Sequence, residues 1–291
     1  MTDFLQLLVN GLMAGAVLAV PAIGFTMIYA VLRFPNFAIG GFATVGAYAG
    51  LVANLSWHVP AYAALAVAFV AAGVVGVVVD EVGLRRLRSG GGPGEALAAA
   101  IAAVAMNIVL ENAVRFVWGN DLRGYDLPLY RDWRVGGIGV GPQQVADGAC
   151  AAVAVLLLVV FLRLARTGKA MRAVAGNPSL AGLKGIDAVA VARLATLIGA
   201  GLAGFGGVLI GLDTQVDPLL GFRAMLSVFA AAVVGGLGSV PGAVAGAFIV
   251  GVGEELSLLV LAPAYRSAVG FVAILAVLLV RPRGLFGERA Y

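Results

Sequence analysis

Long apolar segments separated by short polar connections account for most of the chain. They fall near 4–32, 38–55, 60–80, 95–118, 146–165, 190–212, 222–238, 241–261 and 266–281. An α-helix needs roughly 20 apolar residues to cross a bilayer. The apolar runs are continuous, as in 61–79, whereas the strands of a membrane barrel alternate apolar and polar residues. The pattern predicts an all-α, polytopic membrane protein with about eight to ten spans in a single domain over residues 1–291.

Proline and glycine predict irregularities within these segments. The segment 4–32 is too long for one ordinary span, and Pro21 and Gly24 predict either one kinked, tilted helix or a re-entrant pair. The runs 199–211 and 235–246 are dense in glycine and predict broken helices or close helix crossings. Other glycines form small-xxx-small pairs that let helices pack closely: Gly11/Gly15, Gly46/Gly50, Gly207/Gly211 and Gly242/Gly246.

Basic residues are concentrated in the connection at about 163–193, which the positive-inside rule places in the cytoplasm. Alternation of the spans then puts the remaining basic groups of this side at Arg33, at 85–88 and at 281–289. The connection at about 119–145 lies outside. Its aromatic residues predict anchoring in the membrane interface, and the alternative is a docking surface for an external protein. These residues are Trp118, Tyr125, Tyr130 and Trp133 for anchoring, and Asp121, Arg123, Asp126 and Arg131 for docking.

Composition excludes several classes of function. Hydrophobic residues make up 62% of the chain and charged residues 12%, with a mean hydropathy of +1.02, which leaves too little polar surface for a soluble protein. The net charge of +4 follows from membrane topology, so we expect no nucleic-acid partner. One cysteine, Cys150, and one histidine, His58, exclude Cys-based and His-rich metal sites.

No complete phosphate-binding loop is present in the sequence. The nearest fragment, 167–170, lacks the upstream glycine and the hydroxyl residue after Lys169. We therefore expect no catalytic residues, no metal and no cofactor in this chain.

Few acidic residues lie within the apolar segments, which disfavours ion- or proton-coupled transport. Asn107, Glu111 and Arg115 recur at four-residue spacing and share one helix face. They predict either a Glu111–Arg115 ion pair with Asn107 bonding a neighbouring helix, or part of a translocation pathway. The pairs 254–255 and 80–81 predict interfacial positions or local ion pairs.

Four segments together resemble the permease subunits of ABC importers for branched-chain amino acids, the LivH type. They occur in the family's order across almost the whole chain, and they are GFTMIYAVLRFPNFAIGGFATVGAY (24–48), TGKAMRAVAGNPSLAGLKGID (167–187), VVGGLGSVPGAVAGAFIVGVGEEL (233–256) and VRPRGLFG (280–287). The chain departs from the family at Ile39, Gly40 and Gly41, where relatives carry a polar His-Gly-Glu or His-Gly-Asp. This departure bears on substrate specificity and gating.

The resemblance implies that 167–187 is the cytoplasmic coupling loop that binds an ATPase subunit. The composition alone favours the alternative of an ordinary basic loop. In the residues themselves, Pro178 predicts a helix start after Asn177, and Gly185 permits a tight turn. We expect coupling to involve Arg172, Asn177, Pro178, Gly185 and Ile186. We expect a pathway or hinge to involve Asn36, Asn107, Glu111, Gly235, Gly236, Gly238 and Pro241.

The resemblance also implies the partners: a second homologous permease, two cytoplasmic ATPase subunits that hold ATP and Mg, an external solute-binding protein, and the lipid of the bacterial inner membrane. The chain would supply half of a pathway for branched-chain amino acids or a similar small zwitterionic or neutral solute. The alternative is a stand-alone channel or facilitator whose glycine-rich helices form the filter.

Overall fold

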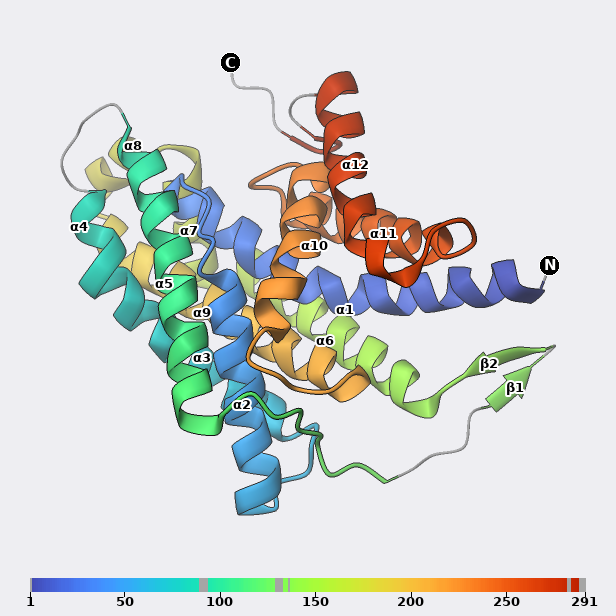
Figure 1. The fold of residues 1–291 in the computed structure, drawn as a ribbon. Coiled ribbons are helices and arrows are strands. Elements are labelled where there is room, and N and C mark those ends of the chain that lie inside the picture. The colour runs from blue at the N-terminus through green and yellow to red at the C-terminus, as the bar shows by residue number, and fades with distance from the viewer. Residues whose placement is uncertain (1, 89–93, 129–132, 136, 282–283, 288–291) are drawn as a thin grey trace.

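A computed structural model describes residues 2–88, 94–128, 133–135, 137–281 and 284–287 (Figure 1). Within these residues nine helices match the apolar segments: α1 (Thr2–Leu32), α2 (Ile39–Trp57), α3 (Ala64–Val79), α5 (Glu95–Trp118), α6 (Pro142–Leu164), α9 (Ala188–Asp213), α10 (Leu220–Gly235), α11 (Val240–Ser257) and α12 (Arg266–Val280). The shorter elements are a π-helical turn (Asp80–Leu84), α4 (Arg85–Leu87), α7 (Arg166–Gly176), α8 (Pro178–Leu183) and a 3-10 turn (Pro263–Tyr265). Strands β1 (Trp133–Val135) and β2 (Ile138–Val140) form an antiparallel hairpin with Trp133 opposite Val140.

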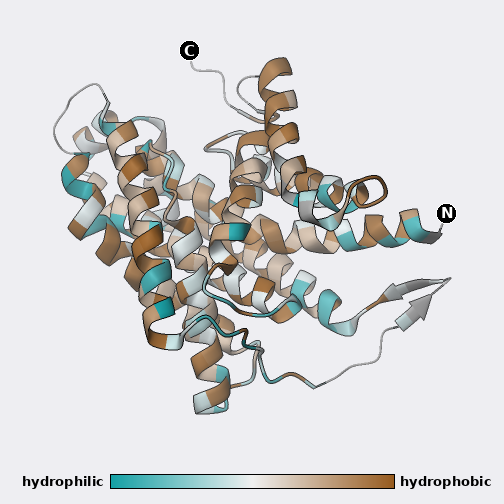
Figure 2. Ribbon diagram, in the orientation of Figure 1, coloured by the Kyte–Doolittle hydropathy of each residue, from teal (hydrophilic) through white to brown (hydrophobic). Residues whose placement is uncertain are grey.

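Seven helical segments of the described chain are long and apolar enough to cross a membrane. They comprise α1, α2, α3 with its continuation through α4, α5, α6, α9 and α11, whereas α10 and α12 are shorter apolar helices. Figure 2 shows hydrophobic residues along the helices and hydrophilic ones mainly near their ends. The all-α, polytopic class is confirmed, and a count above seven requires α10 or α12 to cross as well.

Helix α9 lies at the centre of the bundle and packs against α1, α2 and α3. Helix α1 also runs along α11, while α10 packs on α11 and α12. Glycines make these crossings close: a Cβ on Gly15 would lie 2.9 Å from the Cα of Phe248 in α11, and one on Gly201 would lie 2.8 Å from the ring of Phe69 in α3. The predicted close crossings are confirmed.

The predicted irregularities divide between the two glycine runs. Helix α9 passes unbroken through 199–211, so a broken helix there is wrong; its glycines serve packing. In 235–246 the chain does break, between the end of α10 and the start of α11. Helix α1 is continuous, which excludes the re-entrant pair. The ring of Pro21 packs against Gly206 of α9, where a Cβ would lie only 2.6 Å from the ring.

Basic residues that the sequence assigns to the cytoplasm lie together at one end of the bundle. At the end that carries α4, α7 and α8 (upper left in Figure 1), Arg33 donates to the carbonyl of Ala175, and Arg193 donates to Glu81 at 2.5 Å. At the other end lie the β1–β2 hairpin and the C-terminal ends of α2 and α5. We call these the α7–α8 end and the hairpin end. That the α7–α8 end is cytoplasmic stays a prediction.

The connection at 119–145 contains the hairpin, and α6 begins within it at Pro142. Tyr125 packs against the bundle, and its hydroxyl donates to the carbonyl of Ala47 at 2.6 Å; anchoring in the membrane interface stays a prediction. Burial raises the pKa of the Tyr125 phenol, which keeps it a neutral donor. Arg123 pairs with Val216 in an isolated β-bridge, and Tyr130 and Arg131 lie outside the described residues.

Candidate functional site

Helix α7 attaches the predicted coupling segment to the bundle by one face. Gly168, Met171 and Val174 follow helical spacing and are buried, and Met171 and Val174 pack in a cluster with Val31 of α1 and Val191 of α9. A Cβ on Gly168 would lie 2.6 Å from the Cα of Leu162, so the α6–α7 corner requires glycine. The opposite face of α7, which carries Arg172, is exposed.

Helix α8 begins as the sequence predicts. Asn177 caps it by accepting the N–H of Leu180 at 2.9 Å, with Pro178 in the first turn. At its end Gly185 has a φ of 80°, a left-handed conformation that suits glycine, and Ile186 folds back to pack beside α7. These residues fix the shape of the segment, whereas Arg172 lies on its surface.

Two leucines of α8 are exposed that the sequence analysis did not single out. The exposed fraction is 56% for Leu180 and 84% for Leu183. Both lie at the α7–α8 end, beyond the bundle, where lipid contact does not account for them if this end is cytoplasmic. The signal in the sequence is an apolar Leu-Ala-Gly-Leu run inside a basic, glycine-rich connection.

Asn36 and Asn107 both serve the start of α2. The N–H of Ala38 donates to Oδ1 of Asn36 at 3.1 Å, and the N–H of Gly41 donates to Oδ1 of Asn107, which comes from α5. Helix α5 therefore supplies one of the two side-chain acceptors for the N–H groups at the start of α2. Glu111 pairs with Arg115 at 3.0 Å, so the predicted ion pair is confirmed, while a pathway role for this face of α5 stays a prediction.

The residues Gly235, Gly236, Gly238 and Pro241 form the corner between α10 and α11. Gly236 and Gly238 have φ values of 108° and 92°, and Ser239 caps α11 through the N–H of Gly242 at 3.2 Å. The C-terminal segment holds this corner: the N–H groups of Leu285 and Phe286 donate to the carbonyls of Val234 and Gly235, each at 2.9 Å. A role for the corner as a hinge stays a prediction.

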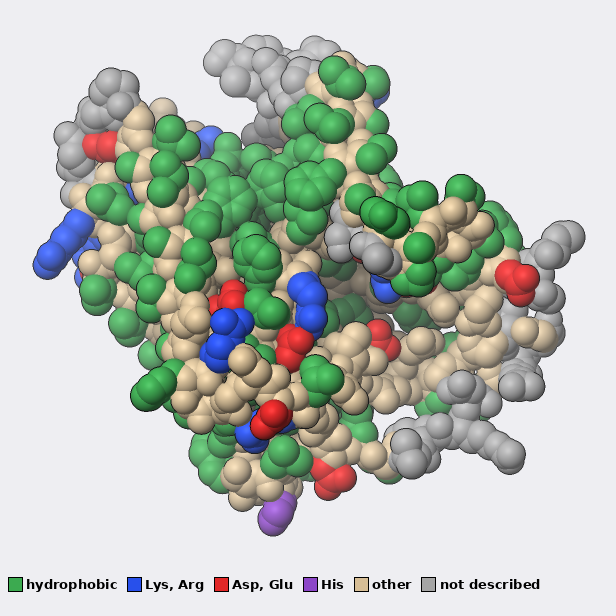
Figure 3. Space-filling model, viewed as in Figure 1, with side chains coloured by type: hydrophobic (Ala, Val, Ile, Leu, Met, Phe, Trp, Pro, Cys, Tyr) green, Lys and Arg blue, Asp and Glu red, His purple; other side chains and the backbone are tan. Residues whose placement is uncertain are grey.

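A cavity of about 500 Å³ opens toward the hairpin end between α1, α6, α9, α10 and α11, and we call it the outer cavity. None of the seven residues predicted for the pathway or hinge lines it. Figure 3 shows that this face is mostly hydrophobic, with charged side chains gathered over its lower centre. The charged residues lining the cavity are Asp147, Asp213, Asp217, Glu254, Glu255, Arg223 and Arg266.

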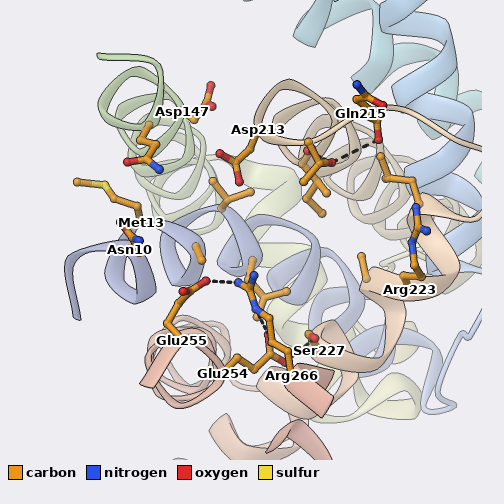
Figure 4. Close-up of a pocket in the computed structure, with 18 of the residues that line it drawn as sticks. Asn10, Met13, Asp147, Asp213, Gln215, Arg223, Ser227, Glu254, Glu255 and Arg266 are labelled. Carbon is orange, nitrogen blue, oxygen red and sulfur yellow. Dashed lines mark hydrogen bonds and ion pairs between the residues drawn. The ribbon is translucent and has the colours of Figure 1, made fainter. Parts of the chain in front are cut away.

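Most of these charges pair with one another (Figure 4). Arg266 bonds Glu255 and lies 3.9 Å from Glu254, which also accepts the Ser227 hydroxyl at 2.6 Å. Arg223 bonds Asp217. Local ion pairing of Glu254 and Glu255 is thus confirmed. The described residues contain no group of three His, Cys, Asp or Glu side chains that could hold a metal ion.

A family model described as the permease component of the branched-chain amino acid transport system matches residues 7–278. This chain belongs to that permease family. The match extends over all nine apolar helices apart from the first residues of α1 and the last of α12. The α7–α8 segment and the outer cavity are therefore both parts of the permease fold.

Curated relatives match this permease along almost their full length. LivH of Salmonella typhimurium, a high-affinity branched-chain amino acid transport system permease protein, is 36% identical over 98% of this chain and 96% of its own. BraD of Pseudomonas aeruginosa, with the same description, is 32% identical over 98% and 96%. A LivH permease protein of Methanocaldococcus jannaschii is 29% identical over 91% and 87%.

Sequence reasoning missed that the acidic residues of this permease converge. The sequence analysis did not single out Asp147, Asp213 or Asp217, and it considered Glu254 and Glu255 only as an interfacial or local pair. The structure brings all five to one cavity. The available signal is that the acids sit near helix ends that face the same side of the membrane.

Proposed function

We propose that this permease is one of two permease subunits in a binding-protein-dependent ABC importer of the bacterial inner membrane. It forms half of the pathway for a branched-chain amino acid or a similar small zwitterionic or neutral solute. Its partners are a second homologous permease, two cytoplasmic ATPase subunits that bind ATP and Mg, and an external binding protein. ATP hydrolysis takes place in the ATPase subunits.

The α7–α8 segment carries this proposal. One face of α7 is fixed to α1 and α9 by buried side chains, while Arg172, Leu180 and Leu183 are exposed. A rigidly attached surface of this kind suits a partner whose movement must reach the transmembrane helices. Displacing α7 also moves its contacts with Val31 and Val191, because packed interiors transmit shifts of this kind.

The experiment is uptake of radiolabelled leucine into proteoliposomes that contain this permease, its candidate partner permease, the ATPases and the binding protein. We expect uptake only when all partners and ATP are present. The matched control contains every protein with a non-hydrolysable ATP analogue. Flux through this chain alone, indifferent to ATP, would overturn the proposal in favour of a stand-alone channel or facilitator.

A further inference from the structure

Asp147 of α6 is a buried carboxylate at the wall of the outer cavity. The residue is 2% exposed, and neither carboxylate oxygen completes a hydrogen bond with the described residues. The Tyr62 hydroxyl interacts with this carboxylate but does not complete a hydrogen bond with it, and it is a neutral group. Burial of an ionised carboxylate costs free energy unless donors compensate it. Asp147 therefore favours a donor, and above all a cationic donor, that enters the cavity.

Asp213, the last residue of α9, adds a second acid at the same place. Its side chain is exposed to the cavity and lies within electrostatic reach of both Asp147 and Arg266. In Figure 4 it lies between these two residues. Among the described residues Asp213 forms no ion pair within 4.0 Å. Two neighbouring acids thus produce a local excess of negative charge.

The rest of the cavity suits the other parts of a small zwitterion. Arg223 uses one guanidinium nitrogen for Asp217, while its side chain is 61% exposed and keeps further N–H donors. Apolar side chains line the wall between the charged groups. They are Met13, Val17, Leu18, Ile210 and Leu220. An ammonium site, a guanidinium and an apolar wall match the chemistry of an aliphatic amino acid.

We propose that Asp147 and Asp213 bind the ammonium group of the transported amino acid in the outer cavity. This inference rests on the proposed function and specifies the class of solute as one that carries a primary ammonium group. A divalent metal ion is a poorer occupant, because the described side chains offer no group of three ligands. The carboxylate of the solute then faces Arg223, which lies across the view from Asp147 and Asp213 in Figure 4.

The first test compares Asp147→Asn and Asp213→Asn in the complete importer. Loss of a charge-assisted hydrogen bond weakens binding about tenfold or more, so we expect leucine uptake per ATP hydrolysed to fall by that factor. ATP hydrolysis stimulated by the binding protein should stay near the wild-type rate. The control is Asp3→Asn, which changes an exposed acid in the first turn of α1 that does not line the cavity. It should leave both quantities unchanged.

The second test uses the wild-type importer and therefore does not depend on how the variants fold. Dicyclohexylcarbodiimide labelling of Asp147 and Asp213 is followed by peptide mass spectrometry. We expect leucine to slow the labelling in proportion to its occupancy. The analogue 4-methyl-2-oxopentanoate keeps the aliphatic chain and the carboxylate but replaces the ammonium group by a ketone, and it should not protect.

The outcomes separate this inference from the proposed function. No ATP-driven uptake by the complete wild-type importer would contradict the proposed function. Wild-type uptake that persists in both Asn variants, or equal protection by leucine and the oxo acid, would overturn the ammonium site alone. A parallel loss of uptake and of stimulated ATP hydrolysis would also overturn it, because it would assign the two acids to docking of the binding protein.

Discussion

Gly46 of α2 and Gly204 of α9 meet where the two helices cross with their backbones in contact. A Cβ on Gly46 would lie 2.6 Å from the carbonyl oxygen of Gly204 and closer still to its Cα. Helix α3 completes the contact, since a Cβ on Gly204 would also approach the backbone carbonyl of Ala68 within 2.8 Å. Three helices therefore depend on the absence of two methyl groups.

Gly46→Ala is expected to destabilise this permease by more than about 2 kcal/mol, because the new methyl group forces apart backbone that cannot move as a side chain can. The measurement is the melting temperature of purified protein in mild detergent, taken from the fraction of protein that stays monodisperse on heating. Gly176→Ala is the matched control: Gly176 ends α7 and has open space around its Cα. Equal melting temperatures for the two variants would contradict a backbone contact at Gly46.

The positions of the helices could be predicted because the bilayer demands long apolar runs, and each predicted segment is a helix. The start of α8 at Asn177 and Pro178 could be predicted from local capping chemistry. The sequence could not predict which polar groups from distant parts of the chain lie together. Asp147 and Asp213 come together only through the packing of α6 and α9 around α1, and that packing depends on many helix contacts that no single motif encodes.

Asn107 tests whether a polar residue inside a span serves structure or transport. Its Oδ1 accepts the N–H of Gly41, one of the early N–H groups of α2 that have no partner within that helix. Asn107→Ala should cost about 1 to 2 kcal/mol of stability, whereas Asn107→Asp keeps the acceptor and most of the stability. Thermal unfolding in detergent measures both.

The control for Asn107 lies on the same helix. Asn112 is exposed and donates to the carbonyl of Ile108 within α5, so Asn112→Ala should change stability little. If Asn107→Asp kept stability but abolished transport in the reconstituted importer, the pathway role would be favoured over the capping role.

Arg88 forms a buried ion pair at the π-helical turn that ends α3. Its Nη2 donates to both oxygens of Asp80, at 2.6 and 2.7 Å, and Asp80 is 3% exposed. Arg88→Gln leaves Asp80 charged and buried, so we expect a loss of about 3 kcal/mol or more. Arg85→Gln removes a surface pair with Glu81 and should have little effect. Urea unfolding in micelles compares the two, and equal losses would refute the distinction.

Leu183 provides the sharpest test of the α7–α8 surface, because it is almost fully exposed and contributes little to folding. If an ATPase subunit covers it, burial stabilises the complex by about 1.5 to 3 kcal/mol. Leu183→Gln should then weaken co-purification of the ATPases roughly tenfold to a hundredfold while the melting temperature of the permease stays constant. Leu87→Gln, which changes an exposed leucine of α4 at the same end, is the control. Equal retention of the ATPases by both variants would mean that Leu183 lies outside the coupling interface.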